Sequence, residues 1–231
     1  MKKSLHLAYI GIITLCFSAC IGEDIIDDFV NPVLRIDNPL VSLAVGEEYQ
    51  FEATYLNNIG QEEEVTLQWE SSDPTTISID ASTGLATGVK NGTATISVSL
   101  ADGGETLVTH SPVAIAEETV LDNPSRAGTI MTTSSYALSG DFVMESVLSK
   151  NIIRISVANN YTASSALPGL YLYLTNNPNS INDAYEVGAV TVFNEAHTYE
   201  ISDTEVELNQ YQYLLYWCKP FSVKVGEGRI N

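Results

Sequence analysis

Tyr211-Gln-Tyr-Leu-Leu-Tyr-Trp-Cys-Lys-Pro-Phe-Ser-Val-Lys-Val-Gly226 is the stretch from which the fold prediction starts. Large aromatic and aliphatic side chains fill its first half, and such residues favour a pleated, partly buried strand. The stretch therefore predicts a buried strand that holds Cys218. Pro220 has no backbone N–H for a sheet ladder, so it indicates an edge or a bulge just after Cys218, where the thiol would meet solvent.

The chain before this stretch repeats a two-residue alternation of apolar and polar side chains, which is typical of strands. Ile153, Ile155 and Val157 share one predicted face, with Arg154 and Ser156 opposite. The same pattern recurs at Leu170, Leu172 and Leu174, at Val190 and Val192, and at Tyr199 and Ile201. No apolar stripe of helical period competes with it. Residues 131–231 are therefore predicted to form a β-sandwich domain.

Three motifs in residues 131–231 resemble the DM-thirteen domain, a small β module of animal and bacterial surface proteins. They are Ser139-Gly140, Gly169-Leu170-Tyr171-Leu172-Tyr173-Leu174-Thr175, and Tyr213-Leu214-Leu215-Tyr216-Trp217-Cys218-Lys219-Pro220-Phe221-Ser222-Val223. The resemblance implies an electron-transfer module in which Cys218 is a redox thiol or a ligand to a prosthetic group such as haem. Tyr216 and Trp217 would then be the packing neighbours that set the exposure of Cys218.

Cys218 also has a second interpretation, as a small buried hydrophobe, which is the commonest role of an unpaired cysteine. A reactive thiolate needs a positive charge nearby, but Lys219 would point to the opposite face of the strand. A haem or metal site would need further ligands, for which the candidates are His197, Met131 and Met144. Motifs for covalent haem, zinc or nucleotide phosphate are missing from the sequence, so no cofactor or metal site is predicted.

A polar, proline-containing segment at residues 118–130 is the predicted linker to a first domain at residues 32–117. Short alternating strands separated by turn residues predict a second antiparallel sandwich there. Inward-facing positions are expected at Val41, Leu43 and Val45, at Tyr49, Phe51, Ala53 and Tyr55, and at Trp69.

Four motifs in residues 32–117 resemble the bacterial immunoglobulin-like domain, group two, of intimin- and invasin-type proteins. They are Leu43-Ala44-Val45-Gly46, Trp69-Glu70-Ser71-Ser72-Asp73-Pro74, Ile79-Asp80-Ala81-Ser82-Thr83-Gly84 and Gly88-Val89-Lys90-Asn91-Gly92-Thr93-Ala94. The resemblance implies a spacer or adhesive module without catalytic residues. Glu62, Glu63 and Glu64 are interpreted as a solvated loop, because no converging oxygen ligands accompany them as a calcium site would require.

The N-terminus has the features of an export signal at residues 1–19. Lys2 and Lys3 precede an apolar run too short to span a bilayer comfortably. Phe17-Ser18-Ala19-Cys20 resembles the lipobox of bacterial lipoproteins, which implies that Cys20 is acylated and becomes the mature N-terminus; cleavage near Ala19 as an ordinary signal peptide is the alternative. Residues 20–31 form an acidic tether, similar to the signals that send lipoproteins of Bacteroidetes-type bacteria to the outer face of the outer membrane.

The composition supports a protein that works at a surface. The chain has 10 basic and 29 acidic residues and a formal net charge of −19, which disfavours nucleic-acid binding. His110 and His197 lack a local nucleophile motif, so an enzyme is not favoured. Cys16 leaves with the signal peptide and Cys20 carries lipid, so Cys218 has no partner for an internal disulfide.

The sequence thus predicts an all-β chain of two consecutive antiparallel β-sandwich domains after a cleaved lipoprotein signal peptide. The Ig-like domain is expected to be a stalk that carries the DM-thirteen-like domain outward from the bacterial outer membrane. Two functions follow. One is electron transfer at Cys218, and the other is non-enzymatic adhesion or binding of a surface glycan or protein, with Cys218 structural.

Overall fold

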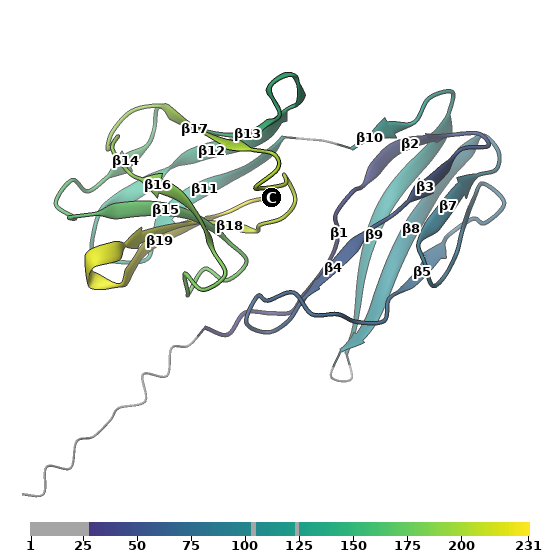
Figure 1. The fold of residues 1–231 in the computed structure, drawn as a ribbon, viewed down its shortest axis with the longest axis horizontal. Helices are drawn as coiled ribbons and strands as arrows, with labels where there is room; N and C mark the ends of the chain where they lie inside the picture. The colour runs from purple at the N-terminus through teal and green to yellow at the C-terminus, as the bar shows by residue number, and fades with distance from the viewer. Residues whose placement is uncertain (1–27, 103–104, 123–124) are drawn as a thin grey trace, which may run out of the picture.

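The computed structural model describes residues 28–102, 105–122 and 125–231. Strands dominate this part of the chain, and its only helices are two single-turn 3₁₀ segments (Figure 1). Among the described residues, no helix has the length and apolar character needed to cross a bilayer. The prediction of an all-β fold is confirmed. The predicted signal peptide, Cys20 and most of the acidic tether lie outside the described residues.

The first domain has a five-stranded sheet in the order β10-β2-β9-β8-β5, together with a pair β1-β4 and a three-stranded sheet β3-β7-β6. One core cluster joins all three sheets, as in a sandwich. The pair β2–β9 is parallel, which departs from the predicted antiparallel pattern, whereas the other pairs are antiparallel. The strands are β1 (Val33–Ile36), β2 (Leu40–Ala44), β3 (Glu48–Gln50), β4 (Ala53–Leu56), β5 (Gln68–Ser71), β6 (Ile77–Ile79), β7 (Leu85–Gly88), β8 (Gly92–Asp102), β9 (Glu105–Ala116) and β10 (Val120–Leu121).

Trp69 lies at the centre of the first core, as the alternation predicted. Its indole is 4% exposed and its ring centroid lies 5.9 Å from that of Phe51. Gly84 has φ +76° and lies against the indole, since an added Cβ would come within 2.8 Å of it. Hydrogen bonds from Ser82 and Thr83 to the Asp80 carboxylate fix the preceding turn and lower the pKa of Asp80 to about 2. The turn at residues 80–84 therefore places Gly84 where the Trp69 indole can pack against it.

Burial along strand β2 follows the predicted alternation only in part. Leu43 is buried in the core as expected, but Val41 and, just after the strand, Val45 are 50% and 52% exposed. Ser42 is buried as well, although its neighbours in the pattern led us to expect a polar, outward position, and its hydroxyl donates a hydrogen bond of 2.8 Å to the carbonyl oxygen of Glu118. A polar side chain can be buried once its hydrogen bond is made.

The second domain is one sheet with the strand order β16-β15-β18-β19-β11-β12-β13-β17, and β14 also pairs with β12. Leu172 in β15 and Ile201 in β17, from opposite ends of this order, belong to one core cluster. A flat sheet could not bring them together, so the sheet curves around its core, as Figure 1 shows. The elements are β11 (Arg126–Thr132), β12 (Leu138–Val147), η1 (Leu148–Lys150), β13 (Ile152–Val157), β14 (Thr162–Ala163), β15 (Leu170–Thr175), β16 (Tyr185–Ala189), β17 (His197–Ser202), β18 (Tyr213–Cys218), η2 (Lys219–Phe221) and β19 (Val223–Arg229).

The connection between the domains is shorter than the predicted linker at residues 118–130. Val120 and Leu121 still pair with β2 of the first domain, and Arg126 already pairs with Met144 of the second. Only residues 122–125 join the two sheets. The segment predicted as a linker is shortened because backbone groups at both of its ends pair with strands, and composition does not reveal such pairing.

The two domains meet at a turn formed by residues 57–61 of the first domain. Gly60 has φ +78°, and an added Cβ would lie 2.9 Å from the carbonyl carbon and oxygen of Asn176 in the second domain. The Asn177 amide donates hydrogen bonds to the carbonyl oxygens of Ile59 (2.9 Å) and Asp28 (2.5 Å). The first described residues thus lie against the second domain (Figure 1). The first domain therefore contacts the second one as well as being joined to it by the chain, and its role as a stalk stays a prediction.

Gly60→Ala is expected to loosen the contact between the domains. The new Cβ would meet the Asn176 backbone, and the left-handed conformation adds strain of about 1 kcal/mol. Gly46→Ala is the matched control, because Gly46 has φ +82° but no atom within 4 Å of an added Cβ. Small-angle scattering should show a larger radius of gyration for Gly60→Ala only. Equal radii for both variants would contradict the importance of this contact.

Candidate functional site

Cys218 lies at the end of β18, between β15 and β19 in the interior of the sheet. Its side chain is 0% exposed and belongs to the core cluster of the second domain. The Cys218 thiol donates to the carbonyl oxygen of Pro168 at 3.5 Å. This environment suits a small apolar side chain with one weak donor.

Pro220 does not bring Cys218 to the solvent, so that expectation is wrong. The strand ends at Cys218, and Pro220 lies in η2, outside the sheet. Lys219 has left the strand as well, and its ammonium group pairs with the Glu186 carboxylate at 2.6 Å and lies 4.4 Å from the centroid of the Tyr171 ring. The neighbouring cation is thus engaged elsewhere and leaves the Cys218 thiol without a charged partner of the kind that activates a thiolate.

The other predicted candidates do not assemble around Cys218 as a ligand set. Met144 is buried in the same core, but Met131 is 60% exposed. His197 faces the core, with its ring centroid 4.9 Å from that of the buried Tyr161 in an edge-on contact. Among the described residues, no group of three or more His, Cys, Asp or Glu side chains is arranged to hold a metal ion.

Tyr161 and Tyr216 place two hydroxyl groups inside the second core. Both side chains are almost fully buried, with ring centroids 6.2 Å apart. Burial is the main cause that raises the pKa of each hydroxyl above its ordinary value. Both phenols therefore stay neutral at physiological pH and act as part of the core.

His110 is an exposed residue on β9 of the five-stranded sheet. The hydroxyl of Ser97 on the neighbouring strand lies 2.8 Å from its Nδ1. Ser97 and His110 lie on an open sheet face, where nothing excludes water from them. The pair is therefore a surface hydrogen bond and does not form a catalytic centre.

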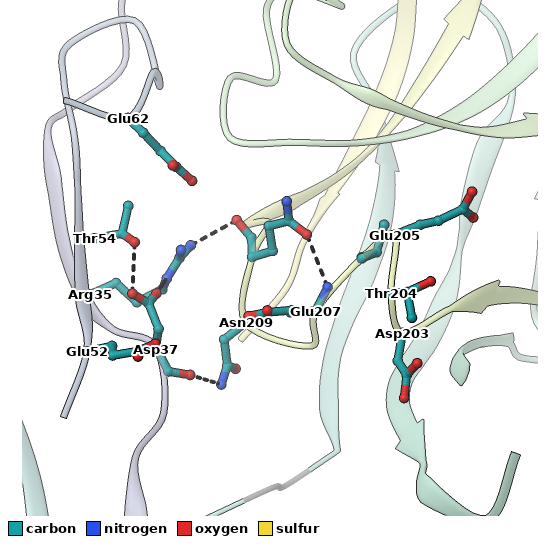
Figure 2. Close-up of a pocket in the computed structure, with 12 residues that line it drawn as sticks. Arg35, Asp37, Glu52, Thr54, Glu62, Asp203, Thr204, Glu205, Glu207 and Asn209 are labelled. Atoms are coloured by element: carbon teal, nitrogen blue, oxygen red, sulfur yellow. Dashed lines mark hydrogen bonds and ion pairs between the residues drawn. The ribbon is translucent and has the colours of Figure 1, made fainter. Parts of the chain in front are cut away.

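A cleft of about 330 Å³ lies between the two domains on one side of their seam. Figure 2 shows first-domain side chains on one wall and the segment of residues 203–210 on the other. Its lining includes six carboxylates, Asp37, Glu52, Glu62, Asp203, Glu205 and Glu207. Sequence reasoning missed this site, because the two acidic groups are more than 130 positions apart and only the folded chain brings them together.

Arg35 and Asn209 form hydrogen bonds between the two walls of the cleft, and further bonds hold Asp37 on the first-domain wall (Figure 2). Arg35 pairs with the Asp37 carboxylate at 2.6 Å and donates to the carbonyl oxygen of Gln210 at 2.9 Å. The Asn209 amide donates to the Asp37 carbonyl oxygen at 2.9 Å, and Thr54 donates to the Asp37 carboxylate at 2.8 Å. The one cation that lines the cleft is thus already paired, and most of the carboxylates are left to face solvent.

A second cleft of about 360 Å³ continues the first and shares Glu62 and Gln210 with it. It adds Gly60, Gln61, Asn176, Asp183 and Tyr211. The Gln61 amide bridges the domains by donating to the Asp183 carboxylate at 2.7 Å. We call the two clefts together the seam groove. It offers carboxylates, side-chain amides and one aromatic ring to a ligand, and no nucleophile paired with a base.

Comparison with known proteins identifies the first domain. Residues 31–110 match the family model of the bacterial Ig-like domain (group 2). The first domain is a bacterial Ig-like domain. The resemblance predicted for it is confirmed, whereas the match does not extend to the second domain, whose DM-thirteen resemblance stays a prediction.

The remaining comparisons add little to this assignment. No curated protein matches the chain. A crystal structure of the S-layer protein rSbsC overlaps 87% of this chain with 12% sequence identity and a TM-score of 0.29. The chain spans 25% of that structure's length. An overlap of this quality assigns neither a fold nor a function.

The Cys218 thiol is expected to resist a thiol reagent in the folded protein. A local opening that costs about 3 kcal/mol would slow labelling by about a hundredfold. The test uses the chain without residues 1–20 and follows its reaction with a chromogenic disulfide, with and without denaturant. Ser149→Cys, in the exposed η1 turn, supplies a fast-reacting control thiol. Labelling of Cys218 as fast as that control would contradict its structural role.

Proposed function

We propose that this protein is a lipid-anchored surface protein that binds its partner without catalysis, through the seam groove. The partner would be a glycan or a protein at the cell exterior. The seam groove is the observation that carries this proposal, because both domains build it and its side chains suit binding. Cys218 has a structural role in this proposal.

The buried thiol argues for binding over electron transfer. Electron transfer at Cys218 would need the sulfur to reach a partner or a prosthetic group, but the side chain is sealed in the core of the second domain. The groove, in contrast, is open to solvent and carries polar groups with free hydrogen-bonding capacity. Ligand sites prefer concave surfaces between domains, which is where this groove lies.

The surface location rests on two features. An Ig-like domain of the bacterial group 2 family makes up the first domain. The Phe17-Ser18-Ala19-Cys20 motif would supply the anchor, since two or more acyl chains bind a membrane stably at about 0.8 kcal/mol per buried CH₂. The acidic tether would direct the protein to the outer face of the outer membrane.

Cys20→Ala is expected to release the protein from the membrane fraction. The physical reason is that the lipid would be attached through the Cys20 sulfur, and alanine offers no such site. Fractionation of cells followed by immunoblotting measures the partition. Cys218→Ala, which leaves the lipobox intact, is the control and should stay in the membrane fraction. Unchanged partition of Cys20→Ala would overturn the lipid anchor.

Glu62→Arg is expected to reduce adhesion of cells that display the protein. Glu62 lines both parts of the seam groove, and the substitution brings a long cation of opposite charge into it. The assay compares attachment to surfaces coated with dextran, mannan or gelatin. Glu63→Arg is the matched control, because Glu63 is an exposed neighbour outside the groove lining.

Attachment should fall for Glu62→Arg and stay near the wild-type level for Glu63→Arg. Two results would contradict the proposed function. One is attachment no better than that of cells without the protein on every coating. The other is an equal effect of both variants, which would mean that general surface charge matters and the groove does not.

A further inference from the structure

The part of the seam groove around Tyr211 has the chemistry of a carbohydrate site. We propose that it binds a neutral oligosaccharide and discriminates against acidic sugars. The inference rests on the proposed function, since it names the class of ligand for the same groove. The residues that carry it are Gln61, Glu62, Asn176, Asp183, Gln210 and Tyr211.

Tyr211 supplies a flat apolar surface that is already fixed in place. Its half-buried ring packs against the core of the second domain and also lines the groove. A sugar ring has an apolar face of C–H groups, and such a face packs on an aromatic ring held in advance at little entropic cost. Burial, together with the nearby negative charges of Glu62 and Asp183, raises the pKa of the Tyr211 hydroxyl. One aromatic ring is thus surrounded by polar groups.

The polar groups around the ring match the hydroxyl groups of a sugar. The carboxylates of Glu62 and Asp183 accept hydrogen bonds, and the amide NH₂ groups of Gln61 and Gln210 add donors. The Asn176 amide shapes the wall instead, because it donates to the Gln210 carbonyl oxygen at 3.1 Å, and the Gln210 side-chain oxygen accepts from the Glu207 N–H at 3.1 Å. Gln61 and Asp183 are held in position by their own hydrogen bond of 2.7 Å across the seam. A site with acceptors on both walls and an aromatic ring can hold a hydroxyl-rich ligand in a defined orientation.

Electrostatics sets the class of sugar. Glu62 and Asp183 flank Tyr211, and five further carboxylates line the adjoining cleft, Asp37, Glu52, Asp203, Glu205 and Glu207. The one cation among these lining residues, Arg35, is paired with Asp37. An acidic sugar would be repelled at distances within the screening length of about 8 Å at physiological salt. A neutral sugar avoids this repulsion and still forms its hydrogen bonds.

The length of the groove favours an oligosaccharide over a single sugar. The two clefts share Glu62 and Gln210, so a chain that lies over Tyr211 can continue along the acidic wall. Because the walls come from both domains, a bound chain would contact both and hold them together. Binding should therefore stabilise the contact at the seam as well as occupy it.

The test is calorimetric titration of the chain without residues 1–20. The probes are neutral hexasaccharides of glucose, mannose and xylose, with hexagalacturonate as the acidic counterpart. At least one neutral probe should bind, with an affinity that changes little between low and high salt, and hexagalacturonate should not. Tyr211→Ala should weaken binding about tenfold, the upper range of an aromatic contact, whereas Tyr211→Phe should retain it. Tyr136→Ala, at an exposed tyrosine outside the groove, is the control.

Three outcomes would overturn the inference: no neutral probe binds, hexagalacturonate binds as well as the neutral probes, or Tyr211→Ala and Tyr136→Ala behave alike. Titration with hexalysine separates this failure from that of the proposed function. If hexalysine binds in a salt-dependent way and Glu62→Arg abolishes its binding, the groove binds a cationic peptide, and only the carbohydrate inference is wrong. If the displayed protein also fails to support groove-dependent adhesion, the proposed function is wrong too.

Discussion

The contact between Gly60 and the Asn176 backbone is the constraint on which the arrangement of this protein depends. No side chain fits between the two segments, and the left-handed backbone at Gly60 lets the turn come this close. The neighbouring Asn177 amide then binds carbonyl oxygens on both sides of the turn, from Ile59 and Asp28. Hydrogen bonds from Arg35 to Gln210, from Asn209 to Asp37 and from Gln61 to Asp183 also join the domains, and these residues line the seam groove.

The polar seam explains how two domains can remain together without a large apolar interface. Arg35 and Asn209 each donate a hydrogen bond to a backbone carbonyl oxygen of the opposite domain. These bonds between the domains therefore use uncharged acceptors and not the carboxylates. The carboxylates of the seam groove face solvent, where water screens their mutual repulsion. Polar interfaces of this kind are usual between domains of one chain, and they contribute modest free energy to the association of the domains. A ligand that contacts both walls could add stability that the seam itself lacks.

Local sequence patterns predicted local structure well, and long-range contacts decided the rest. The alternation around Ile153 and Leu170 and the inward Trp69 were read correctly, because the two-residue period follows from strand geometry alone. Along β2, Leu43 is buried as predicted, but the burial of Ser42 was not foreseen, because its hydroxyl bonds to Glu118 at a distance of 76 positions. The seam groove was missed for the same reason. Glu62 appeared in the sequence only as part of an acidic loop, and nothing local indicated that the segment of residues 203–210 would face it.

Cys218 shows how one residue can invite two opposite interpretations. Pro220 was taken to end the strand at a solvent-exposed edge, but a proline that follows a strand can equally begin a tight turn, and η2 is such a turn. The strand that ends at Cys218 is flanked by β15 and β19, so its last inward side chain is still covered by the core. A thiol in that position contributes packing and one weak hydrogen bond. The exposed carboxylates lie instead at the seam, which is why we place the proposed binding site in the groove that both domains build and not at the Cys218 sulfur.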